Sequence, residues 1–540
     1  MTAPTFLQLN LSDETFEVKS YEELVPGVGG LGWALPLFEK FLSEDPIVFA
    51  VGPLSAVFPG ASKTVAVFRS PQTHGLVTSF AGGQLARFLR AAGYQGMVVV
   101  GRAARPTFVS VDEGRINFSD ASPFLGLDTP KAFERILSSI TGVPGRQSIL
   151  VSGPAAERGL VFSPLYLDEF FSFPRGGLGR AFAQKNLKGI SMSGKKGEQI
   201  PNARRYGEVF TALVKSLKGY SELSELGTLR NLTTEKKLSA VVTNNLTEFN
   251  FVAEELLAPK FARGLGAKRV ACGGCPVGCI HLLRQEKRFT FYDYDGVVAL
   301  GPFLGLSSAG EVGRLLERVW ELGLDPTSLG VILAYITEKE KLEFGSLETY
   351  LTLTEALFAG KEGWAKDLYS GLSSSPTALT LGGMEFLPYF NGYASVLSQV
   401  LQLGATTEEN RGFWLDLDLL GKEIDSSDIV SRLINAEEKK TLAQLLIGCG
   451  YLADTFEDPA TAFAALEALG QGFSHERLLG AAKETLRLKV KIQRSLGFRP
   501  KNVRIPERFF QTPSPQGLLK KEKLAEMVRI YSKKIYEPTN

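Results

Sequence analysis

ACGGCPVGCIHL, residues 271–282, carries three of the four cysteines of a 540-residue chain. Cys272, Cys275 and Cys279 form the pattern C-x2-C-x3-C, and Cys449 follows far downstream. The glycines between the first three let a tight loop wrap a metal without side-chain collisions. Because a cubane cluster needs four thiolates that converge on one site, the pattern predicts one 4Fe-4S cluster, with three ligands from a loop and one from a distant helix.

Two other interpretations of the cysteines stay open. A zinc ion can also take four thiolates, although a typical zinc site uses two C-x2-C pairs and this spacing differs. Free cysteines are often simply buried, although three of them within residues 272–279 argue against chance. Four cysteines in 540 residues are too few for a disulfide scaffold, and their clustering is typical of metal or redox chemistry in a reducing compartment.

The composition is that of an ordinary globular protein. An apolar fraction of 44% supports large cores. A net charge of +2 gives no reason to expect the basic face that binds nucleic acid. The start MTAPTFLQLN lacks the features of a signal peptide, and no window approaches the roughly 18 apolar residues of a membrane span. We therefore expect a cytoplasmic protein with no nucleic-acid and no membrane partner.

The chain changes character near residue 200. Before that point, short β-branched and aromatic runs lie between Gly and Pro, as in PIVFAVGP (46–53) and GMVVVGR (96–102). After the polar stretch 193–205, apolar residues recur at helical spacing, as in EVGRLLERVWELG (311–323). We predict an α+β fold. Its expected domains are a β-rich domain at 1–200, a helical domain with three cluster cysteines at 206–400, and a helical domain with the fourth at 401–540.

Two glycine loops suggest cofactor binding. GVGGLG (27–32) fits a dinucleotide fingerprint, but the preceding YEELVP is no buried strand, so this signal is weak. RGGLGRAFAQKNLK (175–188) suits phosphate better, because glycines allow close backbone approach and Arg175 can bind an anion bidentately. A plain glycine turn before a basic surface helix stays open for the second loop.

The cysteine pattern and several other blocks resemble the aldehyde:ferredoxin oxidoreductase family. Besides RGGLGRAFAQKNLK, these blocks are FAVGPLSAVFPGASKTVAVFRSPQTHG (49–75), AGGQLARFLRAAGYQGMVVVGRA (81–103) and LGLDPTS (322–328). They follow the family's order from about residue 20 to residue 510.

The resemblance implies a β-rich domain followed by two helical domains. A tungsten (or molybdenum) ion would be held by two pterins between them, with the 4Fe-4S cluster nearby. It also implies an aldehyde substrate and ferredoxin or a similar electron acceptor, and it leaves a homodimer open. The implied cofactor contacts are Lys63, Ala81, Gly82, Gly83, Arg175, Gly176, Gly177, Gly179, Gly323, Leu324, Asp325 and Gln444. We expect the RGGLG loop and the AGG turn at 81–83 to face one cavity, with Arg175 pointing into it.

The chain also departs from the family. Trp320 and Gln444 stand where the family has pterin-binding aspartates, and Lys63 replaces an arginine. An amide can still bond a pterin edge, whereas an indole cannot accept a hydrogen bond. The family's acid near the metal corresponds to Asp293 or Asp295, which we predict to be the catalytic proton-transfer groups.

Histidines mark a further departure. The region 404–418 lacks the histidine that the family carries beside the substrate. The chain has only His74, His281 and His475, of which His281 is expected to pack at the cluster and His475 to lie at the surface.

Three hypotheses follow for the function. The first is an oxidoreductase that converts an aldehyde to a carboxylate and sends electrons through the cluster. The second is a non-catalytic or electron-transfer paralogue that keeps the cluster and has lost the tungsten chemistry, as the missing aspartates and histidine favour. The third is a nicotinamide enzyme.

Overall fold

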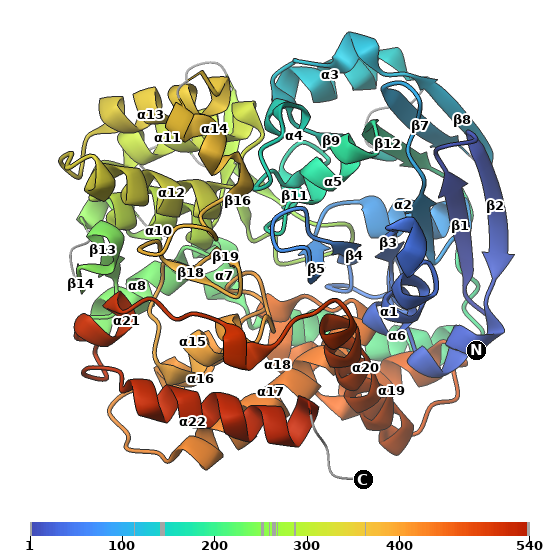
Figure 1. Cartoon of the computed structure of the whole chain (residues 1–540). Helices are drawn as coiled ribbons and strands as arrows, with labels where there is room; N and C mark the ends of the chain where they lie inside the picture. The colour runs from blue at the N-terminus through green and yellow to red at the C-terminus, as the bar shows by residue number, and fades with distance from the viewer. Residues whose placement is uncertain are drawn as a thin grey trace.

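The computed structural model describes residues 3–112, 114–140, 146–249, 253–258, 260–261, 266, 268–285, 288–361 and 363–536. Figure 1 shows the strand-rich N-terminal part at the upper right, the helices of the middle part at the upper left and those of the C-terminal part below. The N-terminal part therefore borders both helical parts.

Two six-stranded sheets build the N-terminal part. The first has the order β2 (Thr15–Ser20), β1 (Thr5–Asn10), β6 (Gly96–Val100), β3 (Ile47–Ala50), β4 (Thr64–Arg69), β5 (Leu76–Ala81). The second has the order β11 (Phe171–Phe173), β10 (Leu165–Leu167), β9 (Gln147–Ser152), β12 (Leu187–Ser193), β7 (Thr107–Asp112), β8 (Arg115–Asp120). Neighbours are antiparallel except β1 with β6 and β12 with β7, which are parallel.

One apolar core joins the two sheets. It combines residues of both sheets with α2 (Leu85–Ala92) and α5 (Leu178–Gln184). The ring of Phe49 on β3 lies 5.5 Å from that of Phe173 on β11, edge to face. The central strands are buried on both faces, since α1 (Leu31–Lys40) covers β3 and β4 while α3 (Thr129–Ser139) covers β9. This explains their near-continuous apolar sequences.

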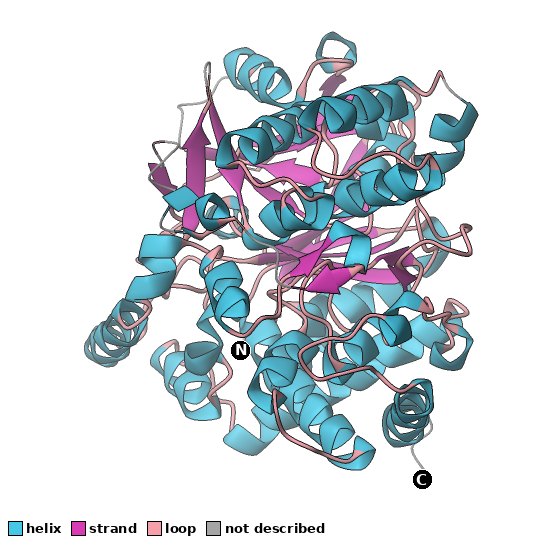
Figure 2. Cartoon of the chain, turned by 90° about the vertical axis from the view of Figure 1, so that its left-hand side faces the viewer, coloured by secondary structure: helices cyan, strands magenta, loops and turns pink. Residues whose placement is uncertain are grey.

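The rest of the chain is mainly helical (Figure 2). Its helices are α6 (Ala203–Lys218), α7 (Ser221–Leu226), α8 (Arg230–Lys237), α10 (Tyr294–Leu300), α11 (Ala309–Leu322), α12 (Pro326–Lys339), α13 (Leu347–Ala359), α14 (Gly363–Asp367), α15 (Tyr393–Val400), α16 (Arg411–Leu419), α17 (Ser426–Leu446), α18 (Ala453–Phe456), α19 (Pro459–Ala468), α20 (His475–Ser495), α21 (Arg508–Gln511) and α22 (Lys521–Tyr531). The α+β prediction is confirmed.

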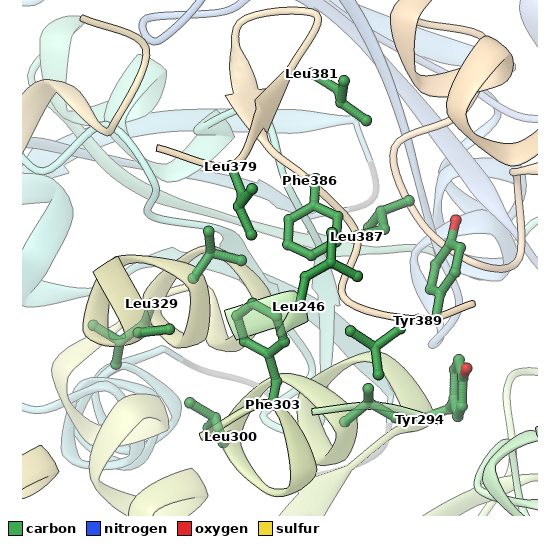
Figure 3. Close-up of a cluster of buried hydrophobic side chains, with 14 of the residues drawn as sticks. Leu246, Tyr294, Leu300, Phe303, Leu329, Leu379, Leu381, Phe386, Leu387 and Tyr389 are labelled. Atoms are coloured by element: carbon green, nitrogen blue, oxygen red, sulfur yellow. The ribbon is translucent and has the colours of Figure 1, made fainter. Parts of the chain in front are cut away.

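The core with the most residues is formed mainly by this helical part. It includes residues on both sides of position 400, from Leu229 to Tyr536, together with Ala155, Leu160, Val161 and Phe162 of the N-terminal part. Figure 3 shows part of it, in which Phe303 and Phe386 face each other and Tyr294 lies beside Tyr389. The division into domains at 206–400 and 401–540 stays a prediction.

A small sheet interrupts the helices. It has the order β15 (Lys268–Val270), β16 (Ile280–Arg284), β17 (Phe289–Tyr292) and was not expected from the sequence. Two further hairpins, β13 (Val242–Thr243) with β14 (Glu248–Phe249) and β18 (Thr380–Leu381) with β19 (Met384–Glu385), are shorter still. Strands of two to five residues are too short for an alternating apolar pattern to become visible.

In the described part of the chain, no single helix is long and apolar enough to cross a membrane. Residues Tyr294–Leu304 and Ala309–Leu322 would qualify together by length and composition, but they are bent by 119° relative to each other.

Candidate redox site

The four cysteines lie on two turns. Cys272, Cys275 and Cys279 occupy the loop from β15 to β16, where Gly274 and Gly278 adopt positive φ. Cys449 was expected on a helix, but α17 ends at Leu446. Ile447 has φ 60° and breaks the helix, so that Cys449 sits in the turn that precedes a short 3-10 helix.

All four cysteines line one cavity of about 110 Å³. The prediction required them to converge from distant parts of the sequence, and the structure brings them together. Other polar or charged residues on the same wall are Ser62, Lys63, Ser172, Thr228, Asp293, Asp295, Thr406, Glu408 and Tyr451. The cavity lies where the N-terminal sheets meet the helical part, which is a common place for ligand sites.

The spacing of the donors bears on the kind of metal. Within the described ranges, no three His, Cys, Asp or Glu side chains are grouped closely enough to hold one metal ion. A zinc ion would need four donors at roughly 2.3 Å from a single point. In a cubane each thiolate binds its own iron, so the four donors surround the cluster and do not meet at one point.

The AGG turn packs directly against the cysteine loop. A Cβ added to Gly82 would lie 2.5 Å from Cys272 Sγ, so a larger residue there would displace the thiol. Gly273 N donates to Gly83 O at 2.9 Å. Asp168 fixes the turn from the other side by accepting from Gln84 N at 2.7 Å. Burial raises the pKa of this carboxyl to about 6 despite its hydrogen bonds.

Lys63 and Glu408 form a half-buried ion pair that lines the cavity. Lys63 Nζ lies 2.7 Å from Glu408 Oε2, and Glu408 Oε1 accepts from Gly450 N at 2.9 Å and from Cys449 Sγ at 3.5 Å. Burial alone would lower the pKa of Lys63, but Glu408 and the cysteines raise it. The role of Glu408 was not predicted from the sequence, because nothing in ATTEEN (405–410) indicates that one of its glutamates contacts a distant cysteine.

Asp293 and Asp295 form a half-buried acidic pair that lines the same cavity. Asp293 caps α10 by accepting from Gly296 N at 2.8 Å. Asp295 accepts from Thr407 N at 3.2 Å and from the Thr407 hydroxyl. Burial raises both pKa values, and the neighbouring Asp293 carboxylate helps to raise that of Asp295 to about 7. A carboxyl that titrates near neutral pH can accept and release a proton.

Arg175 does not share this cavity. It lines a second cavity of about 30 Å³, whereas Gly82 lines the first, so the expectation of a single cavity for both loops is wrong. Its Nη1 lies 2.6 Å from Ser328 Oγ and 3.4 Å from Asp325 Oδ1, and its Nη2 donates to Glu385 O. Asp325 also caps α12 by accepting from Ser328 N at 2.8 Å.

The glycines of the RGGLG loop are required by protein packing. Gly176 and Gly177 have φ of 68° and 80°. A Cβ on Gly177 would lie 2.0 Å from Val161 O, and one on Gly179 would lie 2.3 Å from Pro164 O. Gly323, with φ 74°, follows the last residue of α11, and a Cβ added to it would lie 2.7 Å from Gly153 Cα. These contacts account for the glycines without any ligand.

Trp320 lies in an apolar environment between the sheets and the helices. Its ring lies 6.0 Å from Phe170 and 6.4 Å from Phe291, and Nε1 is buried without a hydrogen-bond partner. It presents no acceptor. Gln444 is buried on α17, and its backbone carbonyl closely approaches Gly30 in the GVGGLG loop. Leu324 is fully buried, and its carbonyl accepts from Tyr166 Oη at 3.1 Å.

The histidines have structural surroundings. His281 is buried, with Nε2 3.1 Å from Ser224 O and Nδ1 3.3 Å from Tyr292 Oη. His475 stacks on Phe463 at 4.5 Å between ring centroids. Neither lines the cysteine cavity.

Family comparisons agree with this architecture. The model of the aldehyde ferredoxin oxidoreductase N-terminal domain matches residues 6–194, and the model of domains 2 and 3 of the same family matches residues 206–537. The chain belongs to the aldehyde ferredoxin oxidoreductase family. It is an oxidoreductase of that type, and the resemblance stated from the sequence is confirmed.

The relatives show how far this member has diverged. The tungsten-containing aldehyde ferredoxin oxidoreductase of Pyrococcus furiosus is 25% identical over 98% of this chain and 95% of its own length. That of Thermococcus kodakarensis is also 25% identical over 98% of this chain and 95% of its own. The WOR-like subunit of an aliphatic sulfonate oxidoreductase from Pyrococcus furiosus is 25% identical over 62% of this chain and 59% of its own.

A solved structure shares the fold. The active-site complex BamBC of benzoyl coenzyme A reductase, in complex with 1,5-dienoyl-CoA, has a chain that superposes with a TM-score of 0.81. That chain is 16% identical, and the match covers 98% of this chain and 94% of the other. The likeness supports the fold alone.

Proposed function

We propose that this enzyme oxidises an aldehyde at a tungsten (or molybdenum) bis-pterin centre and sends the electrons through a 4Fe-4S cluster to ferredoxin or a similar acceptor. The observation that carries the proposal is the single cavity lined by all four cysteines and by the acidic pair Asp293 and Asp295. Family membership and the tungsten-containing relatives support it.

The residues fit the two cofactors unequally. The four thiols can hold a cluster. Thr64 Oγ1 and Gln84 Oε1 are buried without a hydrogen-bond partner and would suit a polar ligand. Thr64 follows the cavity residue Lys63 directly, and Gln84 lies two residues after the cavity residue Gly82. Trp320 offers no acceptor to a pterin amino group, and an unpaired buried amino group costs roughly 1–3 kcal/mol. One pterin is therefore held by other groups, such as backbone carbonyls.

We also propose the other cofactor contacts that the family resemblance implies, including those around Arg175. Arg175 and Asp325 are engaged with each other, and Asp325 is the carboxylate nearest in sequence to Trp320. The other residues proposed to contact cofactor are Lys63, Ala81, Gly82, Gly83, Gly176, Gly177, Gly179, Gly323, Leu324 and Gln444.

The balanced reaction defines how many protons the side chains must accept and release. An aldehyde and one water give a carboxylate, three protons and two electrons. A bound tungsten centre supplies the two-electron oxidation. Asp295, held by Thr407, accepts a proton from the attacking water and passes it on, with Asp293 as its neighbour. Cys272, Cys275, Cys279 and Cys449 would hold a cluster, which would supply the one-electron transfer that an acceptor such as ferredoxin requires.

Metal content and turnover test the proposal. Protein from cells grown with tungstate or molybdate should contain about four irons and one tungsten or molybdenum per chain. It should reduce a dye in the presence of an aldehyde. Asp295→Asn should lower kcat by about 10²–10⁴-fold while both metals are retained. Turnover unchanged in this variant would remove Asp295 from the mechanism.

A second candidate rests on Trp320 and on the histidine that is missing from residues 404–418. An electron-transfer paralogue would keep the cluster and bind no pterin. Four irons without tungsten or molybdenum, after growth with both metals, would favour this candidate over the first.

A further inference from the structure

The segment 403–409, which we call the 403–409 loop, borders the redox cavity between α15 and α16 and belongs to no helix or strand. Thr406 and Glu408 line the cavity. Thr407 holds the proposed proton acceptor Asp295 through its backbone N–H, at 3.2 Å, and through its hydroxyl. Because the loop has no regular secondary structure, contacts with other elements must fix its shape.

A single ammonium group closes this loop. Lys440 Nζ, on α17, donates to Leu403 O at 3.0 Å and to Glu409 O at 3.0 Å, the carbonyls of the first and last loop residues. Its third contact is Glu437 Oε2 at 2.5 Å, one turn earlier on the same helix. An ammonium group has three donors, so all of them are in use. Lys440 is only 3% exposed, which shields these bonds from bulk water.

The two ends of the loop approach each other closely. A Cβ added to Gly404 would lie 2.6 Å from Glu409 O, so the backbones of the two ends are in contact. Leu403 O also accepts from Lys489 Nζ at 3.2 Å, which adds a second cation at that end. Glu409 O depends on Lys440 as its charged donor. A hydrogen bond to a charged group stabilises more than a neutral one, so Lys440 favours the closed loop.

The closed loop controls two contacts at the redox cavity. Thr407 meets Asp295, and Glu408 Oε1 lies 3.5 Å from Cys449 Sγ. Both loop residues lie between the two carbonyls that Lys440 holds, so a change in loop shape alters both contacts together. Lys440 itself lines neither cavity, and it can act on the site only through the loop.

We propose that Lys440 is a positioning residue, which fixes the 403–409 loop and thereby places Thr407 against Asp295 and Glu408 beside Cys449. The effect on proton transfer rests on the proposed aldehyde oxidation, whereas the effect on the loop needs no cofactor. The competing role for Lys440 is to neutralise the buried carboxylate of Glu437, whose Oε1 has no hydrogen-bond partner.

Three variants separate the two roles. Lys440→Met removes the bridge and also leaves the Glu437 carboxylate buried without its cation, which is strongly destabilising. The double variant Glu437→Gln/Lys440→Met removes the bridge together with both charges and avoids that cost. Glu437→Gln alone removes the carboxylate and keeps both carbonyl contacts. Lys439→Met is the control, because Lys439 is the exposed neighbour of Lys440 on α17.

Hydrogen–deuterium exchange of the purified protein reports the shape of the loop without turnover. The amides of Thr407 and Gly450 are bonded to Asp295 and Glu408. In the double variant, peptides that cover residues 403–411 and 449–452 should exchange roughly 10-fold faster or more, as expected for the loss of a charge-assisted hydrogen bond. Glu437→Gln and Lys439→Met should exchange like the wild type.

The cofactor-loaded enzyme gives two further readouts. In the double variant the midpoint potential of the cluster should rise, because the negative charge of Glu408 moves away from Cys449 while the net charge of the protein stays the same. The kcat for an aldehyde should fall by roughly 10²-fold, and KM should change less, since a displaced proton acceptor slows the chemical step.

Two results would overturn the inference. One is that exchange is fast in Lys440→Met and returns to the wild-type rate in the double variant, because Lys440 then only neutralises Glu437. The other is that exchange at 403–411 and the midpoint potential are both unchanged in the double variant. If exchange accelerates as expected but the wild-type protein oxidises no aldehyde, the positioning role stands and the proposed function fails.

Discussion

At the scale of single residues, Gly82 packs closely against Cys272 at the redox cavity. The thiol occupies the space that any side chain at position 82 would need, since an added Cβ would lie 2.5 Å from Cys272 Sγ. The neighbouring Gly273–Gly83 backbone hydrogen bond keeps the two loops from separating. Relief of the clash must therefore move the thiol itself.

Gly82→Ala should consequently lower the iron content, because one cluster ligand is displaced. We expect a loss of roughly half or more of the iron per chain in anaerobically purified protein, with weaker absorption near 400 nm. Gly207→Ala is the control, since a Cβ at that position meets nothing within 4 Å. Full iron content in Gly82→Ala would mean that the loop carrying Cys272 can shift without releasing the cluster.

The Lys63–Glu408 pair sets the charge beside Cys449. Glu408 Oε1 lies 3.5 Å from Cys449 Sγ, so its negative charge should disfavour the reduced cluster. Glu408→Gln should raise the midpoint potential of the cluster, on the order of 50 mV, which corresponds to about 1.2 kcal/mol for one electron. An EPR-monitored redox titration measures this shift. The exposed Glu423→Gln serves as control, and a potential that falls or does not move in Glu408→Gln would contradict this role.

The roles of residues that belong to a local sequence pattern could be predicted. The roles of residues that depend on partners far away in the sequence could not. The spacing of Cys272, Cys275 and Cys279 predicts a shared site, and Cys449 is the one cysteine left to complete it. Glu408 and Lys489 are ordinary charged residues in the sequence. Their environments depend on segments far away, since Glu408 meets Lys63 and Lys489 meets Thr78. Such contacts leave no local signal.

At the scale of elements, Glu235 joins three segments of the helical part. It lies on α8, its Oε2 is 2.5 Å from Tyr294 Oη on α10, and its Oε1 accepts from Phe390 N at 2.8 Å. Tyr294 in turn stacks on Tyr389, as Figure 3 shows. Asp295, the proposed proton acceptor, follows Tyr294 directly, so Glu235 also holds the start of α10 in place.

This carboxyl makes a specific contribution to the pH dependence of stability. Burial raises the pKa of Glu235 from 4.5 to about 8. Between these two values the folded protein binds a proton that the unfolded chain has released, so stability falls as the pH rises. The expected loss between pH 5 and pH 8 is up to a few kcal/mol, at about 1.4 kcal/mol per pKa unit.

Glu235→Gln should flatten that dependence, because glutamine can still accept from Phe390 N and bond Tyr294 Oη without titrating. The measurement is the melting temperature of both proteins at pH 5 and pH 8. The decrease from pH 5 to pH 8 should be smaller in the variant, and Glu423→Gln should behave like the wild type. Equal decreases in all three proteins would show that Glu235 does not titrate in this range.

Elements with long apolar patterns were predictable and the short ones were not. α11 coincides closely with the helical stretch 311–323, and β3 and β6 lie within the strand runs 46–53 and 96–102. The sheet β15–β16–β17 was missed, although it presents the cysteine loop. It is defined by pairing between strands, as in Lys268 with Leu282, and pairing is not visible in a single short run.

At the scale of the whole molecule, the cluster ligands tie together parts of the chain that fold around different cores. Cys272 packs against the core of the two N-terminal sheets. Cys275, Cys279 and Cys449 pack against another core, which combines α6, α17, α19 and α20 with residues 54–61. A cluster bound by all four therefore cross-links the N-terminal part to the helical part.

Loss of the cluster should for this reason weaken the whole fold and not only the redox site. A group that binds the folded chain and not the unfolded chain stabilises the fold by its binding free energy. We expect that anaerobic removal of iron with a chelator lowers the melting temperature by several degrees. Cys449→Ser should melt near the temperature of the iron-free wild type, because the mutation removes the ligand from the turn after α17. If the iron-loaded and iron-free wild-type proteins melt at the same temperature, the protein contacts alone hold the two parts together and the cluster serves only electron transfer.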